Sequence, residues 1–244
     1  MGKLKGRVAL ITGGANGMGA SHARLCAQNG AAVIIADISE QGQAVAAAIG
    51  DRALFVRLDV TDAASWKQAV EAGEARFGPI DILVNNAGAH VAGSFAEAEE
   101  ADFQRLIAVN QMGVFLGMQA VVGTMRRAGR GSIINIASTA ALYGVKKAPI
   151  YAATKWAVRG LTLSAVSEFA AMGVRVNMIM PGPIAGTVMM GENDPAYVEE
   201  MRQRVPMQRL GEVEDVSNVV VFLASDDAGF VTGAQITVDG GISS

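Results

Sequence analysis

The sequence predicts one α/β domain, built as a doubly wound parallel sheet of about seven strands with helices on both faces. Short apolar runs alternate with longer helix-like segments along the whole chain. Most of these runs are apolar on both faces, which is typical of parallel strands that helices cover on both sides. The chain has 244 residues, of which 51% are hydrophobic, so it can fill one large core and is short for two domains. Regular alternation of strand and helix with right-handed crossovers then gives the doubly wound sheet.

The individual elements follow from the apolar pattern. Strands are expected at Val8–Ile11, Ala32–Ala36, Ala53–Leu58, Ile82–Val84, Ser132–Ala137, Arg175–Ile179 and Ala234–Val238. Helices are expected near 17–29, 39–49, 62–77, 99–126, 150–171 and 212–224. Thr61 and Asp62 form a helix-start signal, and glycines at 30, 50 and 173 fall at helix ends. The basic cluster 126–130 is expected to cap the end of its helix and to face solvent.

One segment, about 181–210, does not follow the alternation. It is rich in Pro, Met and Gly and lies between the sixth strand and the last helix. Long irregular segments inside a compact domain are commonly functional loops, so a loop containing a small helix is expected rather than a domain boundary. We therefore predict a single domain over 1–244, with a substrate lid loop at about 183–209.

Composition excludes several classes of protein. The formal net charge is −3, and no basic block exceeds a pair, which argues against a nucleic acid or an anionic membrane as the main partner. The single Cys26 and the two histidines, His22 and His90, leave almost no basis for a metal site, and none is expected. The apolar run near the start is too short for a signal peptide, and no run reaches the ~18 apolar residues that span a bilayer. These features predict a soluble, cytoplasmic protein.

A glycine-rich turn follows the first predicted strand and opens a helix, at residues 12–19. Glycines at 13, 17 and 19 let the backbone approach a pyrophosphate, and the helix N-terminus offers N–H groups and partial positive charge. A tight packing turn is the alternative. Asp37 ends the second strand 20 residues after Gly17, where a carboxylate can accept hydrogen bonds from an adenosine ribose. Asp37 can also cap the helix that starts near Ser39, and the two roles are compatible.

A second pattern joins a tyrosine, a lysine and a serine. Tyr151 and Lys155 are four residues apart and share one helix face, so the ammonium group can lower the pKa of the phenol. A tyrosine with a lowered pKa can transfer protons near neutral pH. Ser138 lies thirteen residues upstream, at the carboxyl end of a predicted strand, where such sheets place their ligands. A Tyr-x-x-x-Lys pair alone is usually a solvated helix face, and the position of Ser138 favours a catalytic set.

With these motifs in place, the chain resembles a short-chain dehydrogenase/reductase of the roughly 250-residue type over its full length. The matching positions, in order and spacing, are Thr12-Gly13-x-x-x-Gly17-x-Gly19, Asp59-Val60, Asn85-Asn86-Ala87-Gly88, Asn110, Ser138, Tyr151-x-x-x-Lys155, Pro181-Gly182 and Val238-Asp239-Gly240-Gly241. The resemblance implies a Rossmann-type fold and a catalytic tetrad. Tyr151 is then the general acid/base, and Lys155 lowers its pKa and binds the nicotinamide ribose. Ser138 orients the substrate oxygen, and Asn110 holds a water that connects Lys155 to solvent.

The same resemblance assigns the cofactor site. The implied contacts are Gly13, Asn16, Gly17, Met18, Gly19, Asp37, Ile38, Asp59, Val60, Asn86, Ala87, Gly88, Tyr151, Lys155, Pro181, Gly182, Ile184 and Thr187. One position departs from the family pattern, because Gly186 stands where the family usually has threonine and Thr187 follows it. The expected cofactor is NAD, since Asp37 would repel a 2′-phosphate.

Three functions are compatible with these residues. The favoured one is an NAD-dependent oxidoreductase that interconverts a secondary alcohol and a ketone. The second is an NADPH-dependent reductase of 3-oxoacyl chains on an acyl carrier protein, which Asp37 and Asn16 disfavour because neither is basic. The third is a non-catalytic nucleotide-sensing protein, which has no reason to keep the Ser-Tyr-Lys set.

Substrate and assembly follow from weaker signals. Phrases at 17–22 and 129–136 are similar to bacterial 3α/20β-hydroxysteroid dehydrogenases. The lid contains apolar residues that suit a bulky alicyclic or steroid-like substrate, although they can also simply pack the lid; they are Val188, Met189, Met190, Tyr197, Val198, Met201, Val205, Pro206 and Met207. His90 is expected on a surface loop, with a place in the substrate cleft as the alternative. The family implies a homotetramer, with close helix contacts through Ala152, Ala153, Ala157, Leu161 and Ala165.

Overall fold

Seven parallel strands form one sheet at the centre of the computed structural model, which describes residues 2–187, 190 and 195–244. The strand order is β3-β2-β1-β4-β5-β6-β7, with every neighbouring pair parallel. The bounds are β1 Val8–Thr12, β2 Ala32–Asp37, β3 Ala53–Arg57, β4 Ile82–Asn85, β5 Gly131–Ile136, β6 Val174–Pro181 and β7 Gln235–Val238. This is the predicted doubly wound α/β fold, and the strand bounds differ from the expected ones by at most two residues.

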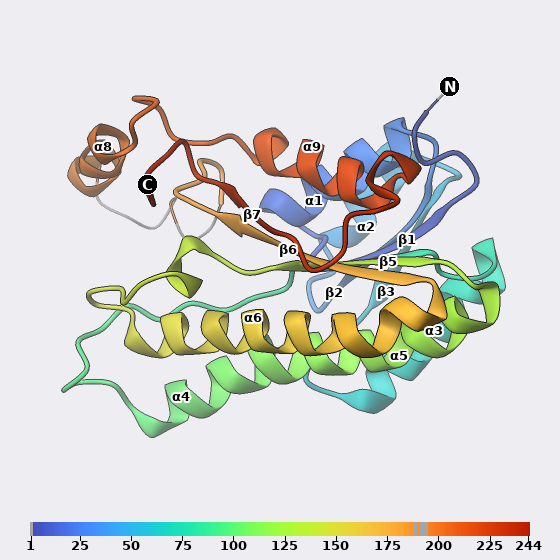
Figure 1. The fold of residues 1–244 in the computed structure, drawn as a ribbon, viewed down its shortest axis with the longest axis horizontal. Coiled ribbons are helices and arrows are strands. Elements are labelled where there is room, and N and C mark those ends of the chain that lie inside the picture. Colours follow the sequence, from blue (N-terminus) through green and yellow to red (C-terminus); the bar gives the residue numbers. More distant parts are fainter. Residues whose placement is uncertain (1, 188–189, 191–194) are drawn as a thin grey trace.

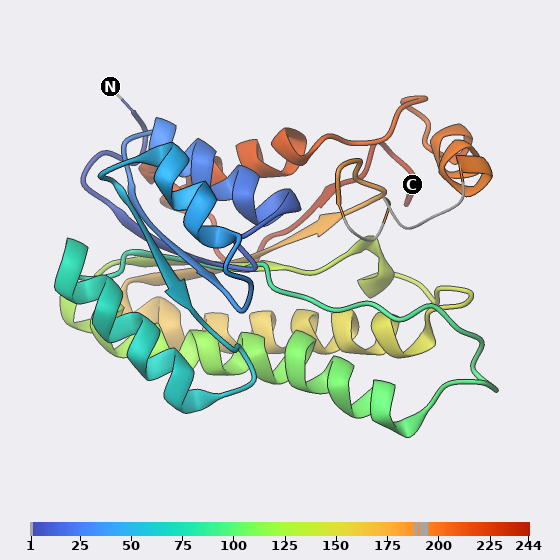
Figure 2. The same ribbon diagram turned by 180° about the vertical axis from the view of Figure 1, so that it is seen from behind.

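Helices cover both faces of this sheet (Figures 1 and 2). One layer holds α1 Gly17–Gln28, α2 Gly42–Ile49 and α9 Val213–Ala224. The other layer holds α3 Ala63–Phe77, α4 Glu100–Leu106, α5 Gly113–Ala128 and α6 Pro149–Phe169. A further helix, α8 Pro195–Arg204, lies outside the two layers, within the segment expected to form the lid. Each face of the sheet buries its own apolar cluster, around Trp66 on the α3–α5–α6 side and around Ile35 on the α1–α2–α9 side.

Two predicted helices differ from the structure. The expected helix 39–49 begins only at Gly42. The expected helix 99–126 is interrupted by a π-helical segment, Ile107–Met112, between α4 and α5. The helix-start signal before α3 is confirmed, because the Asp62 carboxylate accepts hydrogen bonds from the backbone N–H groups of Ala64 and Ser65 at 2.9 and 3.2 Å.

The continuous helical run Glu100–Ala128 is long and apolar enough to span a membrane by length and composition alone. In this fold α5 packs against β4, β5 and β6 and beside α3 and α6. Core helices of globular domains pass the same test, so the run carries no membrane assignment.

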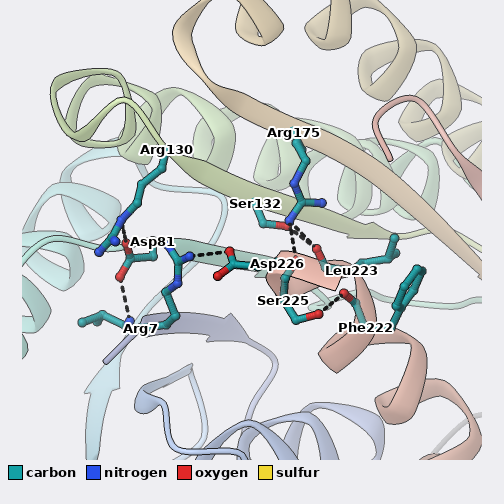
Figure 3. Close-up of polar contacts among 10 residues, drawn as sticks. Arg7, Asp81, Arg130, Ser132, Arg175, Phe222, Leu223, Ser225 and Asp226 are labelled. Carbon is teal, nitrogen blue, oxygen red and sulfur yellow. Dashed lines mark hydrogen bonds and ion pairs between the residues drawn. The ribbon is translucent and has the colours of Figure 1, made fainter. Parts of the chain in front are cut away.

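Positively and negatively charged side chains alternate along the amino ends of the strands. We call this part of the sheet the amino edge (Figure 3). The buried Asp81 carboxylate accepts hydrogen bonds from Val8 N at 3.0 Å and from Arg130 Nε at 2.8 Å. Arg7 lies 3.6 Å from the same carboxylate and contacts Asp226 at 2.6 Å. Arg130 therefore has a structural partner and does not only solvate the end of its helix, as the sequence suggested.

Arg175 completes this edge by binding the end of a helix. Its Nη2 donates to the carbonyl oxygens of Leu223 and Ser225, at 2.8 and 3.2 Å, where α9 ends (Figure 3). Cations stabilise the partial negative charge at helix C-termini, and α5 and α9 both end here. A cavity of about 510 Å³ opens between these residues, but its arginines are already engaged by carboxylates and carbonyl groups. The amino edge is thus a structural feature, at the opposite end of the strands from the candidate site.

Candidate active site

The glycine-rich turn between β1 and α1 forms a close-packed cradle at the carboxyl ends of the strands. Gly13 has φ +64°, and a Cβ placed there would lie 2.9 Å from the Cα of Ala87. A Cβ on Gly19 would overlap the carbonyl oxygen of Gly13. The first turn of α1 carries no acidic residue, so its N–H groups and partial positive charge face the turn uncompensated. These features suit a pyrophosphate.

The loop after β4 is tied to this turn by Thr12. The Thr12 hydroxyl accepts hydrogen bonds from the backbone N–H groups of Asn86 and Ala87, at 2.9 and 3.0 Å. The Asn86 amide in return donates to the carbonyl oxygens of Thr12 and Gly13, at 2.9 and 3.2 Å. Among the described residues, no donor reaches the buried Asn86 Oδ1. A buried acceptor without a partner is costly, so it marks this point of the cleft as a place for a ligand donor.

Asp37 lies at the end of β2 and contacts the glycine-rich turn directly. Its Oδ2 accepts a hydrogen bond from Ala15 N at 3.0 Å, and its Oδ1 accepts one from Ser39 N at 2.9 Å. The expected cap is not made, because α2 begins only at Gly42 with Gln41 as its N-cap. Asp37 instead orders the chain after β2 and braces the glycine-rich turn. A carboxylate has about four acceptor positions, so two remain for ribose hydroxyls.

Other residues expected to contact the cofactor, among them Asp59 and Val60 at the adenine, lie after β2, after β3 and at the start of α1. Ile38 is 61% exposed beside Asp37, which is unusual for an isoleucine and leaves an apolar surface for a ring. Asp59 follows β3 and accepts hydrogen bonds from Thr61 N and Oγ1, which lower the pKa of Asp59. Val60 is buried, and Met18 packs partly into the core on the α1 side. Asn16 is exposed just before α1.

The side chains of Ser138, Tyr151 and Lys155 lie together where β5 ends and α6 begins. Tyr151 and Lys155 lie one turn apart on α6, and both are buried. Ser138 follows β5 and shares a side-chain hydrogen bond with the Tyr151 hydroxyl. Lys155 Nζ lies 5.6 Å from the centre of the Tyr151 ring and donates to the carbonyl oxygen of Ile136 at 3.0 Å. The structure therefore brings the predicted serine, tyrosine and lysine together.

Burial sets the proton affinities of this pair. Burial raises the pKa of Tyr151 to about 12, and the hydrogen bond with Ser138 acts in the opposite direction. Burial also lowers the pKa of Lys155 to about 8. The sequence suggested that Lys155 lowers the pKa of Tyr151. In this structure the net shift of the Tyr151 pKa is upward, because removal of the phenol from water outweighs the hydrogen bond with Ser138.

Asn110 lies in the π-helical segment and is completely buried. Its Oδ1 accepts a hydrogen bond from Ala89 N at 2.7 Å, and its Nδ2 donates to Ala89 O and Thr154 Oγ1, at 2.9 and 3.0 Å. A Cβ on Gly88 would lie 3.4 Å from Asn110 Oδ1 and 3.6 Å from Lys155 Nζ. Asn110 thus anchors the loop after β4 next to Lys155. π-helical segments occur often at functional sites, and the apolar periodicity gave no signal for this one.

The start of the expected lid crosses the glycine-rich turn. Pro181 ends β6, and Ile184 is buried beside Gly211. The Gly182 N–H donates to Val238 O at 3.0 Å, which fixes the chain after β6. A Cβ on Gly17 would lie 3.8 Å from the Cα of Thr187, so Thr187 lies against this turn.

The departure from the family pattern at this point has a conformational reason. Gly186 has φ +70°, a region that disfavours threonine. Thr187 follows it and donates a hydrogen bond to Ile184 O at 2.9 Å. The loop therefore has its threonine at position 187, one residue later than the family pattern.

The rest of the expected lid is only partly apolar at its surface. Met201 and Val205 are buried, whereas Tyr197 and Met207 are exposed at 43% and 63%. Val205 packs near Gly240, so part of this segment holds the lid against the C-terminal residues. Val188 and Met189 lie outside the described residues.

The remaining candidate residues are structural. His22 is fully buried on α1, with Nδ1 2.7 Å from Ser217 Oγ on α9, and burial lowers its pKa to about 3. Cys26 is buried as well, and burial raises its pKa to about 12. Within the described part of the chain, no group of three or more His, Cys, Asp or Glu side chains could hold a metal. His90, expected first on a surface loop and alternatively in the substrate cleft, is half-buried and packs against Tyr151 with ring centres 5.0 Å apart.

The parallel sheet, the glycine-rich cradle and the set of Ser138 with the buried Tyr151 and Lys155 together define a dinucleotide-binding oxidoreductase. A family model described as enoyl-(acyl carrier protein) reductase matches residues 13–243. The chain belongs to the short-chain dehydrogenase/reductase family, whose dehydrogenases act on hydroxyl groups with nicotinamide cofactors.

Similar proteins include dehydrogenases of cyclic alcohols. A 3-alpha-(or 20-beta)-hydroxysteroid dehydrogenase of Mycobacterium tuberculosis is 47% identical over 241 residues, covering 98% of this chain and 90% of the relative. A trans-4-hydroxycyclohexanecarboxylate dehydrogenase of Sinomonas cyclohexanicum is 44% identical over 245 residues, covering 96% and 92%. A 2,5-dichloro-2,5-cyclohexadiene-1,4-diol dehydrogenase of Sphingobium indicum is 42% identical over 245 residues, covering 99% and 98%.

Proposed function

We propose that this protein is an NAD(H)-dependent oxidoreductase that interconverts a secondary alcohol and a ketone on a bulky, mostly apolar, alicyclic or steroid-like substrate. The observation that carries the proposal is the buried contact between Tyr151 and Ser138, with Lys155 on the adjacent turn of α6. This set lies at the carboxyl edge of the sheet, together with the glycine-rich cradle. A hydroxyl pair and a buried ammonium group at a dinucleotide cleft suit proton transfer to and from a substrate oxygen.

The residues of the cleft fit a dinucleotide. The cradle of Gly13 and Gly19 would admit the pyrophosphate, and Asp37 has acceptor positions left for the ribose of the adenosine. Ile38 would cover the adenine, and Thr187 at the start of the lid would lie over the pyrophosphate side of the cleft. A nicotinamide cofactor bound by these residues would supply the chemistry of hydride transfer.

The protein contributes proton transfer and orientation. Tyr151 would remove the proton of the alcohol during oxidation and return it during reduction. Ser138 donates to the oxygen of Tyr151 and would also hydrogen-bond the substrate oxygen, which would orient that oxygen toward Tyr151. Lys155, held by Ile136 O, would place positive charge below the phenol and a donor at the nicotinamide ribose. We assign to Asn110 the positioning of Lys155 and of the loop around Ala89.

The substrate class rests on the lid and on the relatives. Tyr197 and Met207 present apolar surface on the lid segment, and methionine adapts to irregular apolar ligands. The relatives named above act on steroid and cyclohexane-type alcohols. We therefore propose that 183–209 closes over an alicyclic substrate as part of one domain over 1–244.

A substrate panel tests this function. The purified protein is assayed with NAD on steroid alcohols, simple cyclic alcohols, sugars and hydroxy acids, and with NADPH on a 3-oxoacyl carrier-protein substrate. The highest kcat/KM is expected for cyclic or steroid alcohols with NAD. A preference for sugars or hydroxy acids contradicts the apolar lid, and a preference for the NADPH reaction supports the alternative reductase. Binding of NADH without turnover of any carbonyl or alcohol supports a nucleotide sensor instead.

We further propose a cytoplasmic homotetramer. The helical layer that contains α4, α5 and α6 exposes large apolar side chains. They are Phe103, Met112, Phe115, Trp156 and Leu163. Of the residues expected to mediate helix contact, Ala153 is exposed, whereas Ala152 and Ala165 face the core. The contact surface of α6 is therefore formed by Ala153, Trp156 and Leu163. Light scattering at micromolar concentration is expected to give the tetramer mass for the wild type and a smaller mass for Trp156→Glu, and a monomeric wild type contradicts the proposal.

A further inference from the structure

We propose that His90 is a positioning residue for Tyr151, because its imidazole ring packs against the phenol ring and fixes the orientation of the phenol. The centres of the two rings are 5.0 Å apart, and their planes meet at 75°, which is an edge-to-face contact. This geometry is one of the preferred arrangements of aromatic pairs. The inference rests on the proposed acid/base role of Tyr151.

The backbone on both sides of His90 is held in place. On one side, Asn110 binds both the N–H and the carbonyl group of Ala89, at 2.7 and 2.9 Å. On the other side, Gly93 N donates to the carbonyl oxygen of Lys147 at 2.8 Å. Lys147 itself has φ +63°, so the loop that receives this bond has an unusual, fixed conformation. The imidazole is therefore presented to Tyr151 from a segment that is anchored at both ends.

The imidazole ring of His90 lies against the phenol ring of Tyr151 and covers that side of it from water. Ala89 and Val91 pack against a small apolar cluster that contains Tyr151, Ala148 and Ile150. His90 lies between them and is half-buried. Lys155 also faces the Tyr151 ring. Since burial is what raises the pKa of Tyr151, removing the imidazole ring opens a path for water to the phenol and brings this pKa down toward its ordinary value.

Two substitutions separate ring packing from the other properties of histidine. His90→Phe keeps a planar ring at the contact, and His90→Ala removes it. Val91→Ala is the matched control, because Val91 is the next residue of the same loop and packs on the same cluster. An edge-to-face pair changes an equilibrium by about threefold to tenfold, so we expect His90→Ala to lower kcat and kcat/KM by this factor. The KM values for NAD and alcohol stay constant, because an orientation effect acts on the transition state and not on binding.

The second readout does not depend on turnover. The phenol of Tyr151 is titrated by ultraviolet difference absorbance, as the signal that is lost in Tyr151→Phe. We expect the pKa of Tyr151 to fall in His90→Ala and to stay near the wild-type value in His90→Phe and Val91→Ala. We also expect wild-type kcat in His90→Phe, within a factor of about two.

Several results would overturn the proposal. They are an unchanged kcat and an unchanged Tyr151 titration in His90→Ala, an equal loss in His90→Phe and His90→Ala, or the same changes in Val91→Ala. A change of KM alone would assign His90 to substrate contact and would also overturn it. If the wild type turns over no alcohol or ketone, the proposed function fails, and the titration alone then decides whether His90 positions Tyr151.

Discussion

The Oδ2 atom of Asp37 accepts a hydrogen bond from the backbone N–H of Ala15 at 3.0 Å, so the end of β2 is joined to the glycine-rich turn. The carboxylate that we assign to cofactor choice therefore also holds the loop that we propose for the pyrophosphate. Substitutions at this position act on both properties, and the two effects can be separated.

Cofactor discrimination is the first prediction. A negative charge beside the ribose repels a 2′-phosphate, so we expect the wild type to prefer NAD over NADP by about 100-fold or more in kcat/KM. Asp37→Asn removes the charge and keeps one of the two acceptor oxygens, so it should relax the preference while one of the bonds to Ala15 and Ser39 is kept and NAD still binds. Asp37→Ala also loses the bonds to Ala15 and Ser39, so its affinity for NAD should fall as well. Equal use of both cofactors by the wild type contradicts this assignment.

The proton-transfer role of Tyr151 gives the second prediction. Tyr151→Phe keeps the ring contact and removes the hydroxyl, so kcat should fall by about 10²–10⁴ while the Kd of NADH changes little. Tyr143→Phe is the matched control, because Tyr143 is 41% exposed and lies outside the Ser-Tyr-Lys set. Steady-state rates and NADH fluorescence titration measure the two quantities. A wild-type rate in Tyr151→Phe would place the acid/base role on another residue.

We expect Lys155 to lower the stability of the folded protein, although the proposed reaction requires it. Its pKa is about 8 in the folded protein, below the ordinary value of about 10.4 in an unfolded chain. Between these two values the unfolded chain binds more protons, so wild-type stability should rise with pH across this window. Lys155→Met should lack this rise and should be inactive. At pH 7 it should be more stable than the wild type by about 2 kcal/mol, after allowing for the lost hydrogen bond to Ile136.

Urea unfolding at several pH values measures this effect. The stability advantage of Lys155→Met should disappear above about pH 10.4, where Lys155 is neutral in both states. Lys147→Met, at an exposed lysine of the neighbouring loop, is the control and should show no such pH dependence. An advantage that does not vary with pH would show that burial of the charge is not its cause.

His22 gives a prediction at acid pH. Its folded pKa is about 3, below the ordinary value of about 6.5, and among the described residues its buried Nε2 has no partner. As pH falls below about 6.5, the unfolded chain takes up the proton first, so the wild type should lose about 3 kcal/mol of stability by pH 4. His22→Gln does not titrate and can still bond to Ser217, so its stability should vary less over this range. Parallel slopes for the two proteins would exclude His22 as the source.

Most of the fold could be predicted because its strands are short apolar runs that alternate with longer helix-like segments. Asp62 shows that a helix start can be read from one side chain, since the predicted cap is made. The π-helical turn at Asn110 could not be predicted, because its apolar pattern is that of a continuous helix. Its insertion depends on bonds to Ala89 and Thr154, which lie 21 and 44 residues away in the sequence.

The candidate site was predictable where it depends on local spacing and not where it depends on long-range contacts. The four-residue step from Tyr151 to Lys155 needs only the geometry of a helix. The pairing of His90 with Tyr151 joins segments that are far apart in the chain, and a lone histidine after a turn gives no signal of its partner. The balance between burial and the Ser138 hydrogen bond at Tyr151 is likewise a property of the packed protein, so spacing alone could not give the direction of its pKa shift.

The charged side chains at the amino edge have a consequence for which substitutions this protein can accept. Arg7, Asp81 and Asp226 connect the beginnings of the strands, whereas the glycine-rich turn and Ser138 lie at their other ends. The length of the sheet therefore separates these ion pairs from the residues that we propose to contact cofactor and substrate. We expect thermal tolerance to be adjustable by charge substitutions at one end of the strands with the choice of alcohol unaltered, which leaves adaptation to temperature and adaptation to substrate free to proceed independently.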